Sequence, residues 1–257
     1  MAHTKEILTL AVEIADTMLR SGAEIYRVED SVIRILEAYG LEDADVYVLS
    51  NGIFASANEN KEDACSMVRH VPMASIHLSR VAALNQLTRD ICDHKCTIEE
   101  ANTRLQECRH LPSYSHIIVL LSCGLACASF CVLFGGSVME ALFSFCIGVA
   151  EQFFLFTCQR HKVSRFLTTV YASVLISMLS IFVVITGLPV HHDKLVIATI
   201  MPIVPGIVFT TAIRDFYNED YLSGSIHLID ALLTALCIAV GVSLPIVLFR
   251  YLGGLVQ

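Results

Sequence analysis

Five long apolar segments in the second half of the chain constrain its fold more than any other feature. They cover residues 114–134, 137–158, 166–187, 195–213 and 225–249. At a helical rise of about 1.5 Å per residue, each is long enough to cross a hydrocarbon core of about 30 Å. We therefore expect an α-helical integral membrane protein whose transmembrane domain, residues 113–257, contains about five helices.

The distribution of charge indicates a different domain before these segments. Residues 1–113 carry 29 charged side chains, whereas residues 114–257 carry 13, and the change falls near Pro112. The first ten residues contain no apolar run typical of a signal peptide. We therefore expect residues 1–112 to form a polar domain that stays in the cytoplasm. The net charge of −8 argues against nucleic-acid binding.

The first part of this polar domain has helical periodicity. Apolar residues recur at helical spacing over residues 5–20 and again over residues 24–39, which predicts two amphipathic helices. Gly22 lies between them and is the expected end of the first helix. Ser21 and Glu24 have the spacing of a capping box for the second helix.

Strand-like sequence follows the two helices. Three runs rich in β-forming residues cover residues 45–50, 53–57 and 64–70. Asn51-Gly52 lies between the first two runs, and this dipeptide is a strong hairpin signal. Two further helices are predicted after the strands, the second of them starting with a capping box at Thr97 and Glu100. The pattern predicts a small α+β domain.

Lys and Arg set the expected orientation of the transmembrane segments. If the polar domain lies in the cytoplasm, then Arg109, Arg214 and the basic loop at residues 159–165 lie inside, and only Lys194 and Arg250 lie outside. This arrangement satisfies the positive-inside rule. We expect a cytoplasmic N-terminus and a C-terminus, GGLVQ, on the outer side.

The fourth apolar segment is interrupted near its middle by Pro202, Pro205 and Gly206. Transporters use such broken spans to build a binding site inside the bilayer. A half-helix that begins at Gly206 would direct its N–H groups and the positive end of its dipole toward the break, which suits a substrate carboxylate. The alternative is a proline kink that serves packing alone.

Three carboxylates lie within or at the ends of the apolar segments: Glu151, Asp215 and Asp230. An ionisable group at the centre of a span costs at least ~2.5–3.5 kcal/mol, so it usually faces a cavity or a partner. We expect the three to converge on the cytoplasmic half of one cavity, where they could carry a proton or bind a cationic group. For Asp215 and Asp230, the alternative is a position in the headgroup zone.

Three groups of residues contain metal-ligating side chains. They are Cys92–His94–Cys96, Cys123–Cys127–Cys131 and His191–His192–Asp193. For the first group, a helix end with unlinked thiols is favoured over a metal site. For the third group, an exposed polar turn is favoured over a metal site. The second group has a spacing of four residues along one helix and is favoured as a small-residue packing stripe. We therefore expect no metal and no cofactor, and the ten cysteines do not indicate a disulfide framework.

Several short motifs occur along the chain in a characteristic order. They are Gly22-Ala23-Glu24, Arg27-Val28-Glu29, Gly40-Leu41, Ser50-Asn51-Gly52-Ile53, Pro205-Gly206, Asp215 and Gly224. Together with five spans, they resemble the threonine/serine exporter family in its short, split form. The resemblance implies an inner-membrane secondary exporter of threonine and serine, or of dicarboxylates such as succinate, driven by an ion gradient.

The same resemblance implies a partner. In the fused form of the family a second block of about five spans follows the first, and in the split form that block is a separate membrane protein. A hetero-oligomer is therefore expected. The chain departs from its relatives at His227, where the resemblance implies an arginine, and this departure affects the predicted substrate class. The candidate substrate-binding residues are Pro205, Gly206, Asp215, Glu151, Asp230 and His227.

Two other functional classes compete with a transporter. One is a membrane-anchored hydrolase, which would need a nucleophile and a base at a usable spacing, and the polar domain has no such pair in its sequence. The other is a structural or assembly protein held in the membrane by its apolar half. An anchor needs one span, whereas this chain has five, with a broken fourth and buried carboxylates.

Overall fold

The computed structural model describes residues 2–41, 43–58, 64–72, 76–112 and 114–254. The chain divides into two compact units, Met1–Ser113 and Tyr114–Gln257, each of which is described by itself. The elements of the first unit are α1 (Ala2–Arg20), α2 (Ile25–Ala38), β1 (Asp43–Leu49), β2 (Gly52–Asn58), β3 (Ala64–His70), α3 (Leu78–Cys92) and α4 (Ile98–Arg109).

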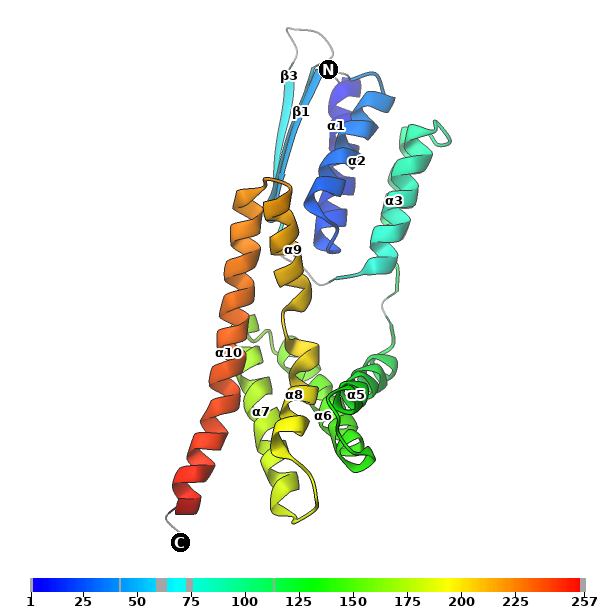
Figure 1. Ribbon diagram of the computed structural model, residues 1–257. Coiled ribbons are helices and arrows are strands. Elements are labelled where there is room, and N and C mark those ends of the chain that lie inside the picture. The colour runs from blue at the N-terminus through cyan, green and yellow to red at the C-terminus, as the bar shows by residue number, and fades with distance from the viewer. Residues whose placement is uncertain (1, 42, 59–63, 73–75, 113, 255–257) are drawn as a thin grey trace. The chain divides into compact units, whose positions relative to one another are not determined.

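The first unit is an α+β fold built on a three-stranded antiparallel sheet in the order β1-β2-β3 (Figure 1). Side chains alternate along β2: Ile53 is buried and Phe54 is exposed. Helix α1 contacts β2 and β3, and α2 contacts β1, so these two helices cover the buried face. The core contains fully buried side chains from the helices as well, such as Leu36 of α2 and Leu84 of α3.

The predicted end of α1 is confirmed, but the predicted capping box at the start of α2 is wrong. Gly22 has a φ of 81° and ends α1, and the N–H of Ala23 bonds to the carbonyl of Met18. Ser21 donates its hydroxyl to the carbonyl of Thr17 at 2.7 Å, so α1 itself uses this side chain. Glu24 is the N-cap residue of α2 and makes no side-chain capping bond. The second predicted box, Thr97 with Glu100, is present at α4.

The predicted hairpin is confirmed, with its loop one residue earlier than expected. Leu49 pairs with Gly52, so the two loop residues are Ser50 and Asn51. This register places Tyr47 opposite Phe54, with ring centroids 6.4 Å apart, and the buried Val48 opposite Ile53. Large side chains therefore meet across the strands, which stabilises this pairing.

The second unit is helical. Its elements are α5 (His116–Leu133), α6 (Val138–Arg160), α7 (Arg165–Ile185), α8 (His192–Ile200), the 3-10 helix η1 (Met201–Ile203), α9 (Gly206–Tyr217) and α10 (Tyr221–Gly254). Within the described ranges, four helices (α5, α6, α7 and α10) are long and apolar enough to span a membrane. A fifth span is formed if His192–Ile203 (α8 with η1) and Gly206–Tyr217 (α9) are counted together; the two parts are bent by 57°. The last three residues lie outside the described residues, so the expected position of the C-terminus stays a prediction.

The helices of the second unit pack through small residues. Helix α5 lies against α6, α10 lies against α7 and α9, and α8 contacts α5, α6 and α7 (Figure 1). A Cβ atom added to Gly148 of α6 would lie 2.5 Å from the sulfur of Cys127 of α5. A Cβ atom on Gly241 of α10 would lie 2.6 Å from Cβ of Ser173 of α7. The bare backbone at these glycines allows the helices to approach closely.

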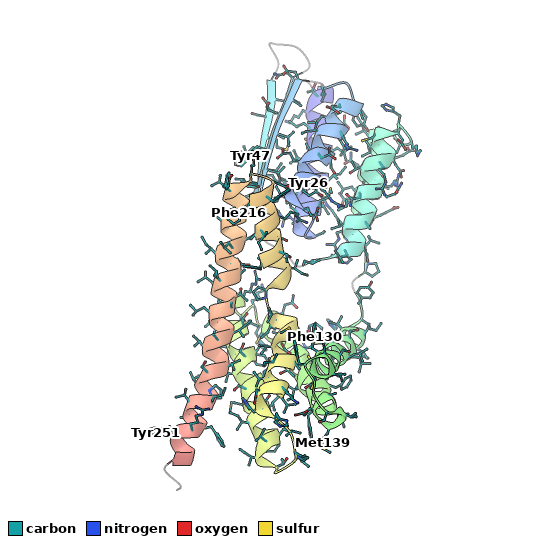
Figure 2. The ribbon with its side chains drawn as sticks, viewed as in Figure 1. Tyr26, Tyr47, Phe130, Met139, Phe216 and Tyr251 are labelled. Atoms are coloured by element: carbon teal, nitrogen blue, oxygen red, sulfur yellow. The ribbon has the colours of Figure 1, made fainter. Side chains whose placement is uncertain are left out.

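The outward side chains of the second unit are mostly large and apolar. Met139 and Tyr251 project away from the helices (Figure 2), and Leu125 is 63% exposed. Hydrophobic helices with an apolar exterior and polar or small interior residues suit a lipid environment. Together with the spanning helices, this surface identifies a multi-pass membrane protein.

Candidate functional site

The interruption predicted in the fourth span is present. Val204 ends η1 in an extended conformation, Pro205 is the N-cap residue of α9, and Gly206 is the first residue of α9. No side chain caps this helix, although the N–H of Gly206 reaches the carbonyl of Val204 at 2.8 Å. A Cβ atom at Gly206 would meet nothing within 4 Å. The start of α9 is therefore a helix N-terminus beside open space, with the positive end of the helix dipole toward the break.

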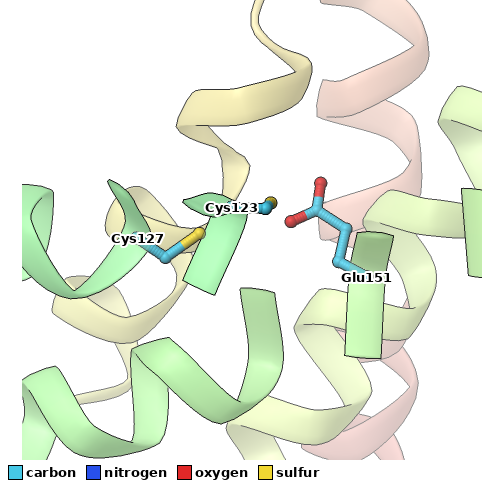
Figure 3. A group of neighbouring side chains, drawn as sticks. All are labelled: Cys123, Cys127 and Glu151. Atoms are coloured by element: carbon cyan, nitrogen blue, oxygen red, sulfur yellow. The ribbon is translucent and has the colours of Figure 1, made fainter. Parts of the chain in front are cut away.

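Glu151 is fully buried in the middle of α6. Neither of its carboxylate oxygens has a hydrogen-bond partner among the described residues. The carboxylate points toward α5, where Cys123 and Cys127 present their sulfur atoms (Figure 3). One ligand atom from each of the three side chains lies within 4.8 Å of the other two. A buried acid in this setting needs a proton or a cation to offset its charge.

Asp215 and His227 form a pair between α9 and α10. The Nδ1 atom of His227 lies 2.7 Å from Oδ2 of Asp215, whose side chain is 6% exposed. Gly224 lies under the ring of Phe216, because a Cβ atom there would lie 2.9 Å from a ring carbon. The two helices form a hairpin that this polar pair and this close contact hold together. His227, the residue at which the chain departs from the expected arginine, is therefore the partner of Asp215.

Asp230 has a different partner. Its Oδ2 atom accepts a hydrogen bond from Nη1 of Arg165 at 2.9 Å, and this ion pair joins α10 to α7. The arginine side chain is half exposed and the aspartate side chain is 13% exposed. A charged hydrogen bond of this kind fixes the start of α7 against the first turns of α10.

The structure does not bring the three predicted carboxylates into one cluster. Asp215 pairs with His227, Asp230 pairs with Arg165, and Glu151 faces the two cysteines. Within the described ranges, Cys123, Cys127 and Glu151 make the one group of His, Cys, Asp or Glu with ligand atoms this close. Depth in the membrane can be counted along the sequence, but the direction in which a helical side chain points depends on how each helix is rotated against its neighbours.

Sequence reasoning missed Glu140, which is almost fully buried at the start of α6. It forms a capping box with Ser137 and also accepts hydrogen bonds from the backbone N–H of His191 at 2.8 Å. The Nδ1 atom of His191 lies 2.8 Å from the same carboxylate, and Lys194 approaches it at 4.0 Å. The spacing of Ser137 and Glu140 was the available signal. The contacts join the start of α6 to the start of α8 and give His191 a structural partner.

The front unit uses its motif residues for structure. Glu24 and Arg27 form an ion pair of 2.9 Å at the start of α2. A carboxylate oxygen of Glu29 accepts the backbone N–H of Val48 at 3.2 Å, which links α2 to β1. Burial raises the pKa of the Cys92 and Cys96 thiols.

Comparison with known proteins connects this geometry to a family. A family model described as "Putative threonine/serine exporter" matches residues 9–249. The chain is 24% identical to the threonine/serine exporter of Corynebacterium glutamicum over 257 residues, which cover 96% of this chain and 52% of that protein. It is also 24% identical to the "Probable succinate transporter subunit YjjP" of Escherichia coli, with 97% of each chain covered.

The relatives differ in length. The chain spans about half of the Corynebacterium exporter, but it spans 97% of the YjjP proteins of Escherichia coli and Klebsiella aerogenes, the latter at 23% identity. No solved structure matches the chain.

Proposed function

The chain belongs to the threonine/serine exporter family, and we propose that it is one subunit of a secondary transporter in the inner membrane. The transporter exports small metabolites that carry a carboxylate, namely threonine and serine or dicarboxylates such as succinate. The family is one of transporters and not of enzymes, so the hydrolase considered from the sequence has no support.

The break between η1 and α9 is the observation that carries this proposal. An uncapped helix N-terminus beside open space at Gly206 offers backbone N–H groups and a positive dipole end. Both amino acids and dicarboxylates present a carboxylate to such a site. Many secondary transporters have broken helices that direct their N-termini at anionic substrate groups.

Glu151 is our candidate for the ion-coupling group. A carboxyl group buried between helices, without a hydrogen-bond partner among the described residues, is suited to take up and release a proton. In this proposal the pairs Asp215–His227 and Asp230–Arg165 hold the helices around the transport pathway in place. The two pairs fix α10 against α9 and α7 near one end of the unit, so their opening would accompany a change of conformation.

A second subunit completes the transporter in this proposal. The YjjP relatives, which the chain matches over nearly their full length, are named transporter subunits. The longer Corynebacterium exporter has room for another block of similar size. Alternating access in many transporters uses two related repeats, and one block of about five spans is half of that arrangement. The partner is thus a separate membrane protein of about five spans.

The proposed orientation places the front unit in the cytoplasm. Arg109, Arg214 and the Arg160–Arg165 loop then lie on the cytoplasmic side, and Lys194 and Arg250 lie on the other. The α9–α10 hairpin, with Asp215 and His227, is at the cytoplasmic end in this arrangement. We further propose that the front unit, which is cytoplasmic in this orientation, acts as a gate or as a sensor of cytoplasmic substrate.

Counterflow in proteoliposomes tests the proposal. Vesicles containing the chain and its partner are loaded with unlabelled threonine, serine or succinate, and entry of the labelled compound is measured. We expect uptake of at least one of the three with both subunits present and little with either subunit alone. Absence of uptake of all three under every ion gradient tried would overturn the proposal.

A separate variant tests the proposed substrate-carboxylate site at the start of α9. Gly206→Val places a side chain at the start of α9, where an added Cβ atom would meet nothing within 4 Å. Loss of the helix-dipole contact should raise the KM for substrate by roughly 3- to 30-fold, with little change in folding. Ile207→Val, which alters the exposed neighbouring side chain and no backbone N–H, is the matched control. An unchanged KM in Gly206→Val would remove α9 from the site.

A further inference from the structure

Cys123, Cys127 and Glu151 form a group whose chemistry is not explained by carboxylate transport. All three side chains are buried, and their ligand atoms lie within 4.8 Å of one another. The cysteines are four residues apart on α5, so one face of the helix presents both sulfurs toward α6 (Figure 3). The carboxylate comes from α6 and points toward Cys123, with Cys127 beyond it.

The carboxylate of Glu151 is the independent sign that this group has a ligand. It is fully buried, and neither oxygen has a hydrogen-bond partner among the described residues. A buried polar group without a partner is costly, and a buried charge is more so. A bound cation would give the carboxylate oxygen the partner that it lacks, and two sulfur ligands are already in place beside it.

Gly148 contributes to the shape of the space. It lies on α6, one turn before Glu151, and a Cβ atom there would lie 2.5 Å from the sulfur of Cys127 and 3.0 Å from its Cβ. Any larger residue at this position would displace the thiol. The bare backbone therefore keeps Cys127 directed into the same space as the carboxylate.

The ligand set selects a class of cation. Two sulfurs and one carboxylate oxygen suit Zn²⁺ or Cd²⁺, whereas Mg²⁺ and Ca²⁺ prefer oxygen ligands alone. Zn²⁺ binds at about 2.3 Å from sulfur and 2.0–2.2 Å from oxygen, so its ligand atoms lie about 3.5–3.8 Å apart. The three ligand atoms are at most 4.8 Å apart. Side-chain rotations that move these atoms by about 1 Å would bring them to the spacing of zinc ligands.

We propose that Cys123, Cys127 and Glu151 bind one thiophilic divalent cation, Zn²⁺, which ties α5 to α6. Binding replaces the two thiol protons, which leave to solvent, and the carboxylate oxygen completes a set of three protein ligands. No electrons are transferred, and a water molecule fills the fourth position. The site shares Glu151 with the proposed ion-coupling step, so the bound cation and the coupled proton are alternative occupants of this carboxylate. Formation of the site itself depends only on these three side chains.

Cadmium titration of the purified full chain in detergent tests the site. Cd²⁺ bound to thiolates gives a charge-transfer absorption in the ultraviolet that free Cd²⁺ and carboxylate complexes lack. We expect this absorption to saturate at one Cd²⁺ per chain, to be displaced by Zn²⁺ and to be unaffected by Mg²⁺. A wild-type chain that shows no saturable thiolate absorption would overturn the proposal.

Variants separate this site from the other thiols. C123S and C127S should each abolish the high-affinity absorption, and E151Q should weaken Cd²⁺ binding by at least about tenfold. C131S is the matched control, since Cys131 is buried on the same stripe of α5 outside the group, and it should bind as the wild type does. Equal binding by the C123S/C127S double variant and the wild type would place the metal elsewhere and overturn the proposal. Thermal melting without metal checks that each variant is folded.

Discussion

The two units of this chain place their polar and apolar residues in opposite ways. In the front unit, large apolar side chains such as Leu36 and Leu84 are fully buried, and the charged pairs lie nearer the surface. In the second unit, large apolar side chains such as Leu125 lie outside, whereas Ser144 and Ser177 are fully buried. The difference reflects what surrounds each unit: water around the front unit and lipid around the second.

The comparison shows which forces hold each unit together. Water around the front unit drives burial of apolar surface, at roughly 25 cal/mol per Å². Lipid is as apolar as a leucine side chain, so it provides no such force between membrane helices. There, close packing at glycines and a few polar contacts hold the helices, as at Gly241 beside Ser173 and at Ser177, which donates to the carbonyl of Val242 at 3.0 Å.

The largest expected difference in stability comes from a Leu→Ala truncation made once in each unit. Leu36→Ala removes a fully buried side chain from the front unit and should destabilise it by about 2–5 kcal/mol. Leu125→Ala changes a side chain on the outside of α5, where lipid or detergent takes the place of the lost atoms, so it should cost less than about 0.6 kcal/mol, the contribution of leucine to membrane insertion. Urea titration of the full chain in detergent, followed by proteolysis, measures both. Equal losses would mean that the Leu125 face is packed against protein.

The polar pair of the α9–α10 hairpin should give the next largest effect. Asp215→Ala removes the 2.7 Å contact with His227 and should destabilise the second unit by about 1.5–3 kcal/mol, the range for charged hydrogen bonds. His227→Arg keeps a donor opposite Asp215 and should retain most of that stability. Thermal melting in detergent compares the two. Wild-type melting of Asp215→Ala would show that the close contact of Gly224 with Phe216 holds the hairpin alone.

Glycine substitutions test the close packing of α7 and α10. Gly241→Ala would place a methyl group 2.6 Å from the backbone oxygen of Val170, which cannot move without shifting α7. We expect a loss of about 1–3 kcal/mol, typical of overpacking. Gly206→Ala is the control, because its methyl group enters open space. If both variants melt alike, close approach at Gly241 is not needed for stability.

The smallest effect is a pH dependence in the front unit. Arg104 donates a 2.6 Å hydrogen bond to Asp90 and holds the pKa of that carboxyl below its ordinary value. Because the folded pKa is lowered, the pair stabilises the fold above the ordinary aspartate pKa of about 3.9, and this contribution is lost as the pH falls through the folded pKa.

Arg104→Met should therefore melt slightly below the wild type at pH 7, and the gap should close under acid conditions. Arg34→Met, which removes an exposed cation from α2, controls for the loss of one surface charge. A gap that stays constant as the pH falls would show that Arg104 acts through packing.

Local signals in the sequence predicted much of this fold. The three strands, the end of α1, the start of α4 and the break at Pro205 depend on residues that are close in sequence, so spacing and turn chemistry were enough. The Ser21–Glu24 box failed because α1 and α2 compete for the same short segment, and Ser21 bonds back into α1.

The candidate site was less predictable, because it depends on contacts between helices. Glu151, Asp215 and Asp230 can be picked out in the sequence as carboxylates in or at the ends of apolar segments, but their neighbours come from α5, α10 and α7. Each helix can rotate about its axis without changing its hydrophobic length, and that rotation decides which side chains meet. The sequence marks His227 and Cys123 as candidate residues, but it does not show that His227 faces Asp215 or that Cys123 faces Glu151.

The most direct test of the transport account is counterflow with Glu151→Gln in vesicles that also contain the partner subunit. Glutamine has nearly the same shape but cannot release a proton, so we expect the transport rate to fall at least about tenfold while thermal melting shows a folded protein. Glu107→Gln, an exposed change in the front unit, should transport at the wild-type rate. A wild-type rate in Glu151→Gln, with substrate still coupled to the ion gradient, would contradict the account.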